Sequence, residues 1–96
     1  MAIKVLIKRK VAADKGAQLK ELEMQLRSLS MKQPGYVSGE SLRNVDRQNE
    51  FLVISTWDNL PAWKAWQSRK ERAKIQDQID ALLGQKTEYE IYEYRP

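Results

Sequence analysis

Apolar positions along the chain recur with two different periods, which separate predicted strands from predicted helices. Ile3, Val5 and Ile7 alternate with mostly polar neighbours, which predicts a strand over residues 2–10. Residues 51–57 begin with four consecutive apolar side chains, and successive side chains of a strand point to opposite faces. This segment therefore predicts a strand that needs cover on both faces, as a central strand usually does.

Two further segments predict weaker strands. Residues 35–44 mix apolar and polar side chains and contain Gly39, which is typical of an edge strand. The polar stretch at 44–49 predicts a turn, so this strand should form a hairpin with the one that follows. A tyrosine-rich segment, residues 86–94, predicts the last strand.

Leucines spaced three and four residues apart predict an amphipathic helix after the first strand. They are Leu19, Leu22, Leu26 and Leu29. Asp14 is the expected N-terminal cap, because its carboxylate can accept from free backbone N–H groups. Pro34 disfavours helical geometry in the residue before it, so we expect the helix to end near Lys32.

A second helix is predicted after the third strand. Asp58 or Asn59 is its expected cap, and Pro61 fits the first turn. The charged run at residues 69–72 separates two apolar stripes and is expected to mark a bend. Gly84 is the expected C-terminal cap, since glycine readily adopts the left-handed conformation that ends a helix.

The predicted order is βαββαβ in one domain over residues 1–96. This order is that of a ferredoxin-like α+β fold, in which a four-stranded antiparallel sheet carries both helices on one face. The handedness of the crossovers places strands one and three side by side in the centre. Those are also the two most apolar strands, so topology and pattern agree.

Two helices can cover only one face of such a sheet. The other face would leave a large apolar patch in water, which soluble monomers rarely tolerate. We expect that face to be covered by a second copy of the chain, related by a twofold axis. The alternatives are a monomer with a water-facing, tyrosine-rich sheet and a complex with another protein.

Composition removes several kinds of chemistry. The chain has no Cys and no His, which excludes disulfides, a thiolate nucleophile, a Cys-based zinc site and the usual haem ligand. The formal charge is +4, but the basic residues are scattered, so we expect no nucleic-acid partner. No apolar run is long enough to span a bilayer and the first residues do not resemble a signal peptide. We therefore expect a cytoplasmic protein without a membrane partner.

Three sequence features together resemble the antibiotic biosynthesis monooxygenase family. They are Pro34-Gly35-Tyr36 after the first helix, a strand ending in Trp57, and Trp63-Lys64-Ala65-Trp66-Gln67-Ser68. The resemblance covers essentially the whole chain and implies a dimeric α+β barrel. That architecture hosts cofactor-free quinone-forming monooxygenases, haem-degrading enzymes and members of unknown activity, so the fold alone does not select a reaction.

The resemblance implies different roles for different residues. Trp66 matches a tryptophan that lines the substrate cavity of haem-degrading relatives, and packing between helix and sheet is an equally good reading of it. For Trp57 and Trp63 we favour packing. Haem degradation is disfavoured, because the positions of the expected asparagine and histidine hold Ile7 and Gln76.

The quinone-forming members oxidise phenolic rings and need polar groups that hold a phenolate. The resemblance therefore makes Tyr36, Arg43, Tyr92 and Tyr94 candidates to hold a phenolate. The predicted substrate-binding residues are Trp66, from its match to the cavity tryptophan, with Tyr36, Arg43 and Tyr92. Cross-strand packing of the tyrosines and a solvated edge position for Arg43 are the simpler readings. We predict no cofactor and no metal, and the sequence does not identify a catalytic residue.

The predicted function is thus a cofactor-independent monooxygenase acting on a small aromatic compound. The alternative is a non-catalytic small-ligand-binding or structural homodimer of the same fold. An apolar cavity on the order of several hundred Å³ with convergent polar groups would favour the enzyme. A helix–sheet interface packed solid around Trp66 would favour the alternative.

Overall fold

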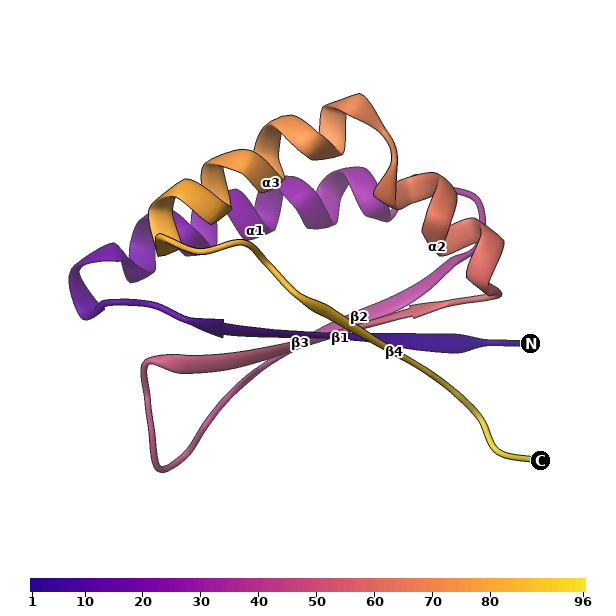
Figure 1. Cartoon of the computed structure of the whole chain (residues 1–96), viewed down its shortest axis with the longest axis horizontal. Helices are drawn as coiled ribbons and strands as arrows, with labels where there is room; N and C mark the ends of the chain where they lie inside the picture. Colours follow the sequence, from indigo (N-terminus) through magenta and orange to yellow (C-terminus); the bar gives the residue numbers. More distant parts are fainter.

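The computed structural model describes residues 1–96, and its helices all lie on one face of a four-stranded sheet (Figure 1). The elements in chain order are β1 (Ile3–Lys10), η1 (Ala13–Lys15), α1 (Gly16–Ser30), β2 (Tyr36–Arg43), β3 (Glu50–Trp57), α2 (Leu60–Gln67), α3 (Lys70–Leu83) and β4 (Tyr89–Glu93). No helix combines the length and the apolar character needed to cross a membrane.

The sheet has the order β2-β3-β1-β4, and each neighbouring pair is antiparallel. The two most apolar strands therefore lie in the centre and the glycine-containing β2 lies at an edge, which confirms the predicted ferredoxin-like α+β fold. In β1, Ile3, Val5 and Ile7 are buried beneath the helices, while the alternate side chains point to the opposite face.

Several predicted boundaries differ from the structure. The prediction of Asp14 as a helix cap is wrong: Asp14 lies within η1, whose turn is closed by a 2.9 Å hydrogen bond from the Lys15 N–H to the Ala12 carbonyl. This turn provides the entry to α1 without a side-chain cap. Helix α1 ends at Ser30, slightly before the predicted Lys32, and β4 is shorter than the predicted last strand.

The predicted second helix is two helices. Arg69 adopts an extended backbone with φ −72° and ψ 138°, so the chain leaves α2 and begins α3 in a new direction. The predicted caps at the outer ends are confirmed. The Asn59 side chain accepts from the Ala62 N–H at 2.9 Å, and Gly84 ends α3 in the left-handed conformation with φ 71°.

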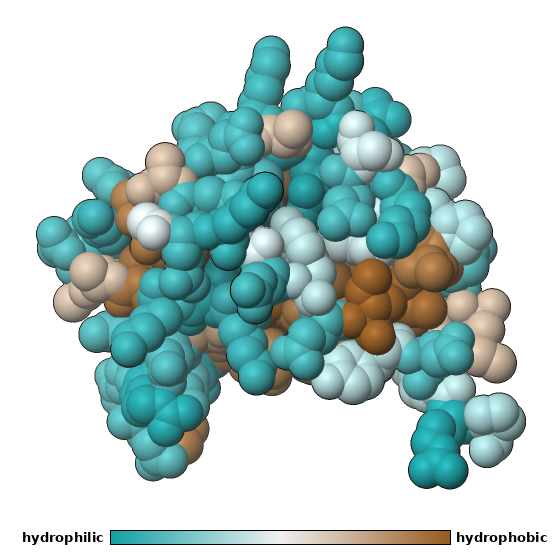
Figure 2. Space-filling view, in the orientation of Figure 1, coloured by the Kyte–Doolittle hydropathy of each residue, from teal (hydrophilic) through white to brown (hydrophobic).

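The core fills the space between the helix layer and the sheet and has two parts. One contains Ile3, Val5 and Ile7 with the three tryptophans; the other joins Val11 of the loop after β1 to α1 and α3. In the view of Figure 2, apolar side chains lie between the two layers beneath a mainly hydrophilic helix surface. The first part of the core contributes Ile7, Trp63 and Trp66 to the lining of the candidate site.

The face of the sheet that carries no helix is mixed in character. By register it presents apolar side chains from all four strands: Leu6, Leu42, Leu52, Ile54 and Tyr92. The outer members are exposed, with Tyr92 at 54% and Leu42 at 48%. No element of the chain covers this face (Figure 1).

Candidate active site

A cavity of about 90 Å³ lies between the helix layer and the sheet. Strands β1, β2 and β3 form its floor, and helices α1, α2 and α3 form its walls. The residues that determine its chemistry are Ile7, Arg9, Tyr36, Trp63, Trp66 and Arg72. The cavity is smaller than the several hundred Å³ typical of drug-sized sites, so it has room only for a small molecule.

Aromatic side chains build one wall of the cavity. The indole of Trp66 stacks on that of Trp57 with 6.5 Å between ring centroids and 23° between ring planes. Trp63 meets Trp57 edge to face at 6.0 Å, and Tyr36 packs edge-on against Trp57 at 5.5 Å. The interface around Trp66 is therefore aromatic and ordered, but it is not packed solid, because Trp66 and Tyr36 border the cavity.

An irregularity in β2 turns Tyr36 toward the helices. The pairing with β3 shifts between Tyr36 and Ser38, so Tyr36 and Gly39 both come to face the cavity side although they are three residues apart. A Cβ at Gly39 would lie 2.9 Å from the Tyr36 hydroxyl. The absence of a side chain at Gly39 therefore leaves room for the tyrosine hydroxyl.

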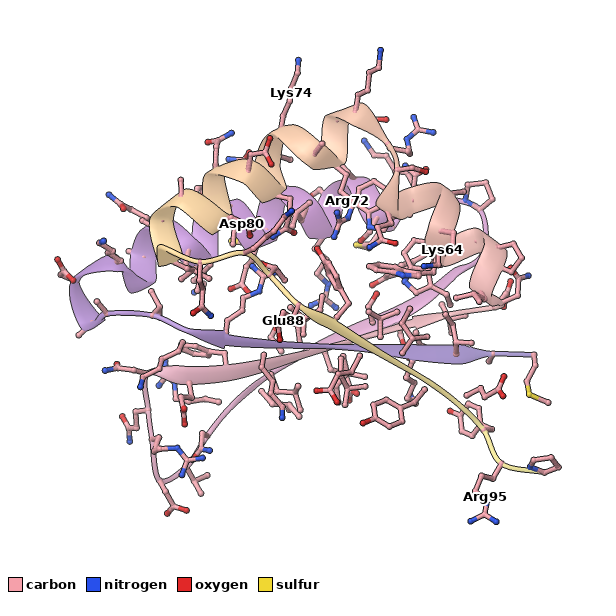
Figure 3. The ribbon with its side chains drawn as sticks, viewed as in Figure 1. Lys64, Arg72, Lys74, Asp80, Glu88 and Arg95 are labelled. Carbon is pink, nitrogen blue, oxygen red and sulfur yellow. The ribbon has the colours of Figure 1, made fainter.

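Arg72 points from α3 into the space between the layers, whereas Lys74 on the same helix points away from the sheet (Figure 3). Arg72 is 6% exposed, and its guanidinium carbon lies 5.5 Å from the Trp63 ring centroid and 5.3 Å from that of Tyr89. One nitrogen, Nη2, donates to the Tyr89 hydroxyl. The Nε atom is buried and has no partner.

Arg9 is a second buried cation at the cavity. It is 4% exposed, and its Nε and Nη1 atoms have no hydrogen-bond partner. The Glu23 carboxylate lies 3.6 Å from Nε, which makes an ion pair but is too long for a good hydrogen bond. Burial lowers the pKa of Arg9, and burial raises the pKa of Glu23; in each case the partner's charge opposes the shift only in part.

Gln76 links the cavity to the start of β4. Its amide donates to the carboxylate of Asp80 and to the hydroxyl of Thr87, each at 2.8 Å. The Arg72 guanidinium approaches the amide oxygen at 3.4 Å. Ile7, the other position relevant to haem chemistry, is buried in the core and lines the same cavity.

The unpartnered polar atoms of the molecule converge on this region. They belong to Arg9, Glu23, Trp63 and Arg72, and all four residues line the cavity. Buried polar groups without partners are uncommon in native proteins and mark places where a ligand or water can bind. No three His, Cys, Asp or Glu side chains come together as a metal-binding group. The arrangement is suited to hold an anionic or strongly polar oxygen beside an apolar ring.

Two of the four predicted substrate-binding residues, Trp66 and Tyr36, border the cavity together. Arg43 and Tyr92 lie elsewhere. The Arg43 guanidinium is 5.3 Å from the Phe51 ring centroid near the hairpin end of β2, and Tyr92 lies on the helix-free face. The Tyr92 hydroxyl donates to Glu90 at 3.0 Å, and this hydrogen bond raises the pKa of Tyr92.

Sequence reasoning did not single out Arg9 and Arg72, because each sits in a run of basic residues that resembles a solvated surface. A signal was present in both cases. Arg9 continues the alternation of Ile3, Val5 and Ile7, which places it on the buried face of β1. Arg72 is three and seven residues before Ile75 and Ile79, which places it on the buried stripe of α3.

Comparison with known proteins agrees with this architecture. A conserved protein from Methanosarcina mazei Go1 superposes with a TM-score of 0.90 at 18% identity, over 99% of this chain and 94% of the other. SnoaB, a cofactor-independent oxygenase from Streptomyces nogalater, superposes with a TM-score of 0.87 at 18% identity and the same coverage. Rv0793 from Mycobacterium tuberculosis gives 0.86 at 12% identity, over 100% of this chain and 97% of the other.

At these identities the structural matches establish the fold and no more. No curated protein matches the chain significantly. The family model for antibiotic biosynthesis monooxygenase matches residues 2–78, which is most of the chain and includes every element from β1 to most of α3. The chain belongs to the antibiotic biosynthesis monooxygenase family.

Proposed function

We propose that the chain is a cofactor-independent monooxygenase that oxidises a small phenolic compound in the cavity between helices and sheet. One observation supports this most strongly: the aromatic-walled cavity is lined by Arg72 and Trp63, and each has a buried nitrogen without a hydrogen-bond partner. The membership in the monooxygenase family and the similarity in fold to a cofactor-independent oxygenase support the same reaction class.

In this proposal the substrate ring lies against Trp66, Ile7 and Val53, and its oxygen accepts from the free donors of Arg72 and Trp63. A phenol becomes reactive toward oxygen when it is ionised, because the phenolate is richer in electrons. Donors fixed in advance in a site of low polarity stabilise such a charge more strongly than water does. Arg72 is held in place by Trp63 and Tyr89, so it needs little reorganisation.

The reaction balances without a cofactor. One atom of O₂ enters the ring opposite the hydroxyl, the other leaves as water, and the ring gives up two hydrogens to become a quinone. The four electrons that O₂ takes up all come from the substrate. The protein's part is to bind the ring, stabilise the phenolate and keep bulk water away from it.

The four predicted substrate-binding residues fall into two pairs, one at the cavity and one outside it. Tyr36 and Trp66 are proposed to contact the ring, because both border the cavity. Arg43 and Tyr92 lie outside it, so their contact with a ligand would require a larger molecule or a contribution from a second copy.

Oxygen uptake tests the proposal. Purified protein is mixed with phenol or 1-naphthol in buffer with a metal chelator and catalase, and O₂ is followed with an electrode while quinone absorbance is recorded. Uptake matched by quinone formation, and lost after heat inactivation, is the expected result. Rates equal to those of the heat-inactivated sample for every phenol would refute the proposal.

We also propose that the chain forms a homodimer through the helix-free face. The apolar side chains of that face come from all four strands, and Leu6, Leu52 and Ile54 lie at its centre with no cover from their own chain. A twofold arrangement of two such faces buries them against one another. Sedimentation that shows only monomer at micromolar concentration would remove this proposal.

A non-catalytic ligand-binding role is the second candidate, and the small volume of the cavity favours it. Binding of phenols without any oxygen uptake in the assay above would select it. Haem degradation stays disfavoured, since Gln76 already bonds to Asp80 and Thr87 and Ile7 has no hydrogen-bonding group. Stoichiometric haem binding, followed by loss of the Soret band with ascorbate in air, would contradict that expectation.

A further inference from the structure

Buried positive charge exceeds buried negative charge around the cavity. Arg9 and Arg72 are both almost fully buried, at 4% and 6% exposed, while Glu23 is the one acidic side chain within ion-pair distance of either. Asp80 is also close, but its carboxylate already accepts from Gln76 and Thr87. Burying a charge without a partner is costly, so this arrangement favours a ligand that brings a negative charge.

Arg9 is the less satisfied of the two cations. Arg72 donates to Tyr89 and lies over aromatic rings, whereas no side chain of the protein accepts a hydrogen bond from Arg9 Nε or Nη1. Glu23 approaches only to 3.6 Å and its own Oε2 is also without a hydrogen-bond partner. Arg9 therefore lines the cavity with buried donors that no group of the protein uses.

We propose that Arg9 is a specificity-determining residue that binds a carboxylate, so that the cavity takes a small aromatic carboxylate. A guanidinium matches the planar carboxylate group and forms hydrogen bonds stronger than those to neutral oxygens. Ile7, Val53 and Trp66 supply the apolar surface for a single ring. Combined with the proposed function, on which this step rests, the substrate is a phenol that also carries a carboxylate.

Intrinsic tryptophan fluorescence can report binding without turnover. All three tryptophans of the chain, Trp57, Trp63 and Trp66, belong to the core cluster at the cavity. Titrations under argon use benzoate, its neutral counterpart benzamide, and sodium chloride at matched ionic strength. Benzoate is expected to bind at least about tenfold more tightly than benzamide, a difference of about 1.4 kcal/mol.

A matched pair of variants assigns that preference to Arg9. Arg9→Met removes the buried cation, and Lys10→Met removes the neighbouring, exposed cation on the other face of β1. The benzoate preference is expected to disappear in the first and persist in the second. Arg9→Lys keeps the charge and is expected to keep part of the preference, so it serves if Arg9→Met does not fold.

The outcomes separate this inference from the proposed function. Equal binding of benzoate and benzamide, quenching by chloride equal to that by benzoate, or equal losses in Arg9→Met and Lys10→Met would overturn the carboxylate assignment. Oxygen uptake with phenols in the same wild-type preparation would still support the monooxygenase. Tight, Arg9-dependent binding of benzoate without oxygen uptake from any phenol would support the carboxylate assignment and refute the monooxygenase.

Discussion

At the scale of single residues, the cavity joins features that seldom occur together in a core. Trp66 is 4% exposed and stacks on Trp57, so it contributes to packing as well as to the cavity wall. Arg72 lies over Trp63, Trp66 and Tyr89 at centroid distances of 5.3–6.0 Å, an arrangement that stabilises a cation through the aromatic faces. These contacts fix the position of a charge that a solvated arginine would not hold.

Trp66→Phe tests whether this side chain serves the ligand or only the core. The phenyl ring keeps most of the apolar contact with Trp57, so the midpoint of urea unfolding should move little. Affinity for phenol, measured by fluorescence of the remaining tryptophans, should fall several-fold because the wall of the cavity recedes. A loss of stability of several kcal/mol with unchanged affinity, as for a core truncation, would contradict the assignment.

Glu23 gives the molecule a pH dependence whose sign can be derived. Burial raises the pKa of Glu23, so between its unfolded and folded pKa values the folded state holds a proton that the unfolded state has lost. Stability contributed by this group is therefore greatest below the unfolded pKa and decreases as pH rises to the folded one. Wild type should lose stability relative to Glu23→Gln as pH increases from 4 upward, about the ordinary pKa of Glu.

Chemical unfolding of both proteins at several pH values measures this difference. Glu23→Gln preserves the size of the side chain and removes its titration together with its charge next to Arg9, so the pH dependence of the difference reports on this pair. A wild-type advantage that grows with pH would mean that attraction to Arg9 outweighs burial, and the derived sign would be wrong.

The site was only partly predictable at this scale, for a physical reason. Trp66 and Tyr36 were predicted from the resemblance to the family, in which large aromatics and tyrosines are candidates to contact a substrate ring. Arg9 and Arg72 are long polar side chains, which normally reach water from almost any position. Periodicity indicates the face on which Arg9 and Arg72 lie, but whether such a long side chain stays buried depends on the elements that pack over it.

At the scale of elements, short connections decide where the cavity walls stand. The extended backbone of Arg69 redirects the chain so that α2 carries Trp63 and Trp66 while α3 brings Arg72 to the same space. Gly35 adopts φ 85° just before β2, and its carbonyl accepts from the Asp58 N–H at 2.8 Å. That contact holds the start of β2 against the start of α2.

Gly35→Ala should disrupt this contact. A Cβ at Gly35 would lie 2.5 Å from the Cβ of Ala62, and the positive φ disfavours any side chain. The expected loss of unfolding free energy is about 1–3 kcal/mol. Gly16→Ala is the control, since nothing lies within 4 Å of its added Cβ and its φ is −60°. Equal stability of the two variants would show that the tight approach carries no constraint.

The order and pairing of elements were predictable because they depend on periodicity and on general rules of chain topology. The unbroken apolar run of β3 correctly indicated a central strand. The break at residues 68–69 was expected only as a bend, since both flanking segments have helical patterns. The irregular pairing at Tyr36 was not foreseen either, because one shifted residue leaves almost no trace in the alternation of a weakly apolar strand.

At the scale of the whole molecule, the sheet separates the cavity on one face from the exposed apolar side chains on the other. The helix-covered face encloses the cavity, and the helix-free face presents the apolar side chains proposed for dimerisation (Figure 1). A ligand bound between helices and sheet would therefore leave the helix-free face available for the proposed dimer. Substitutions on the helix-free face should alter the association of two chains and leave the residues that line the cavity in place.

Leu52→Lys tests the dimer. Leu52 pairs with Lys8 and Leu42 across the strands, so a new lysine has no acidic neighbour directly opposite. Burying an unpaired charge in an interface is strongly unfavourable, and sedimentation equilibrium should show a shift toward monomer. Val45→Lys is the control, because Val45 is 86% exposed in the hairpin turn. Dimers of equal strength in both variants would place the interface elsewhere.

The most direct test of the account is the rate of phenol oxidation in Arg72→Met compared with Lys74→Met. Both changes remove one positive charge from α3, but only Arg72 faces the cavity (Figure 3). Loss of a donor that stabilises the reacting oxyanion typically lowers the rate by about 10²–10³-fold. We predict that loss in Arg72→Met and a nearly wild-type rate in Lys74→Met, with circular dichroism confirming that both fold. Equal rates in two folded variants would contradict the claim that this cavity is the site of oxidation.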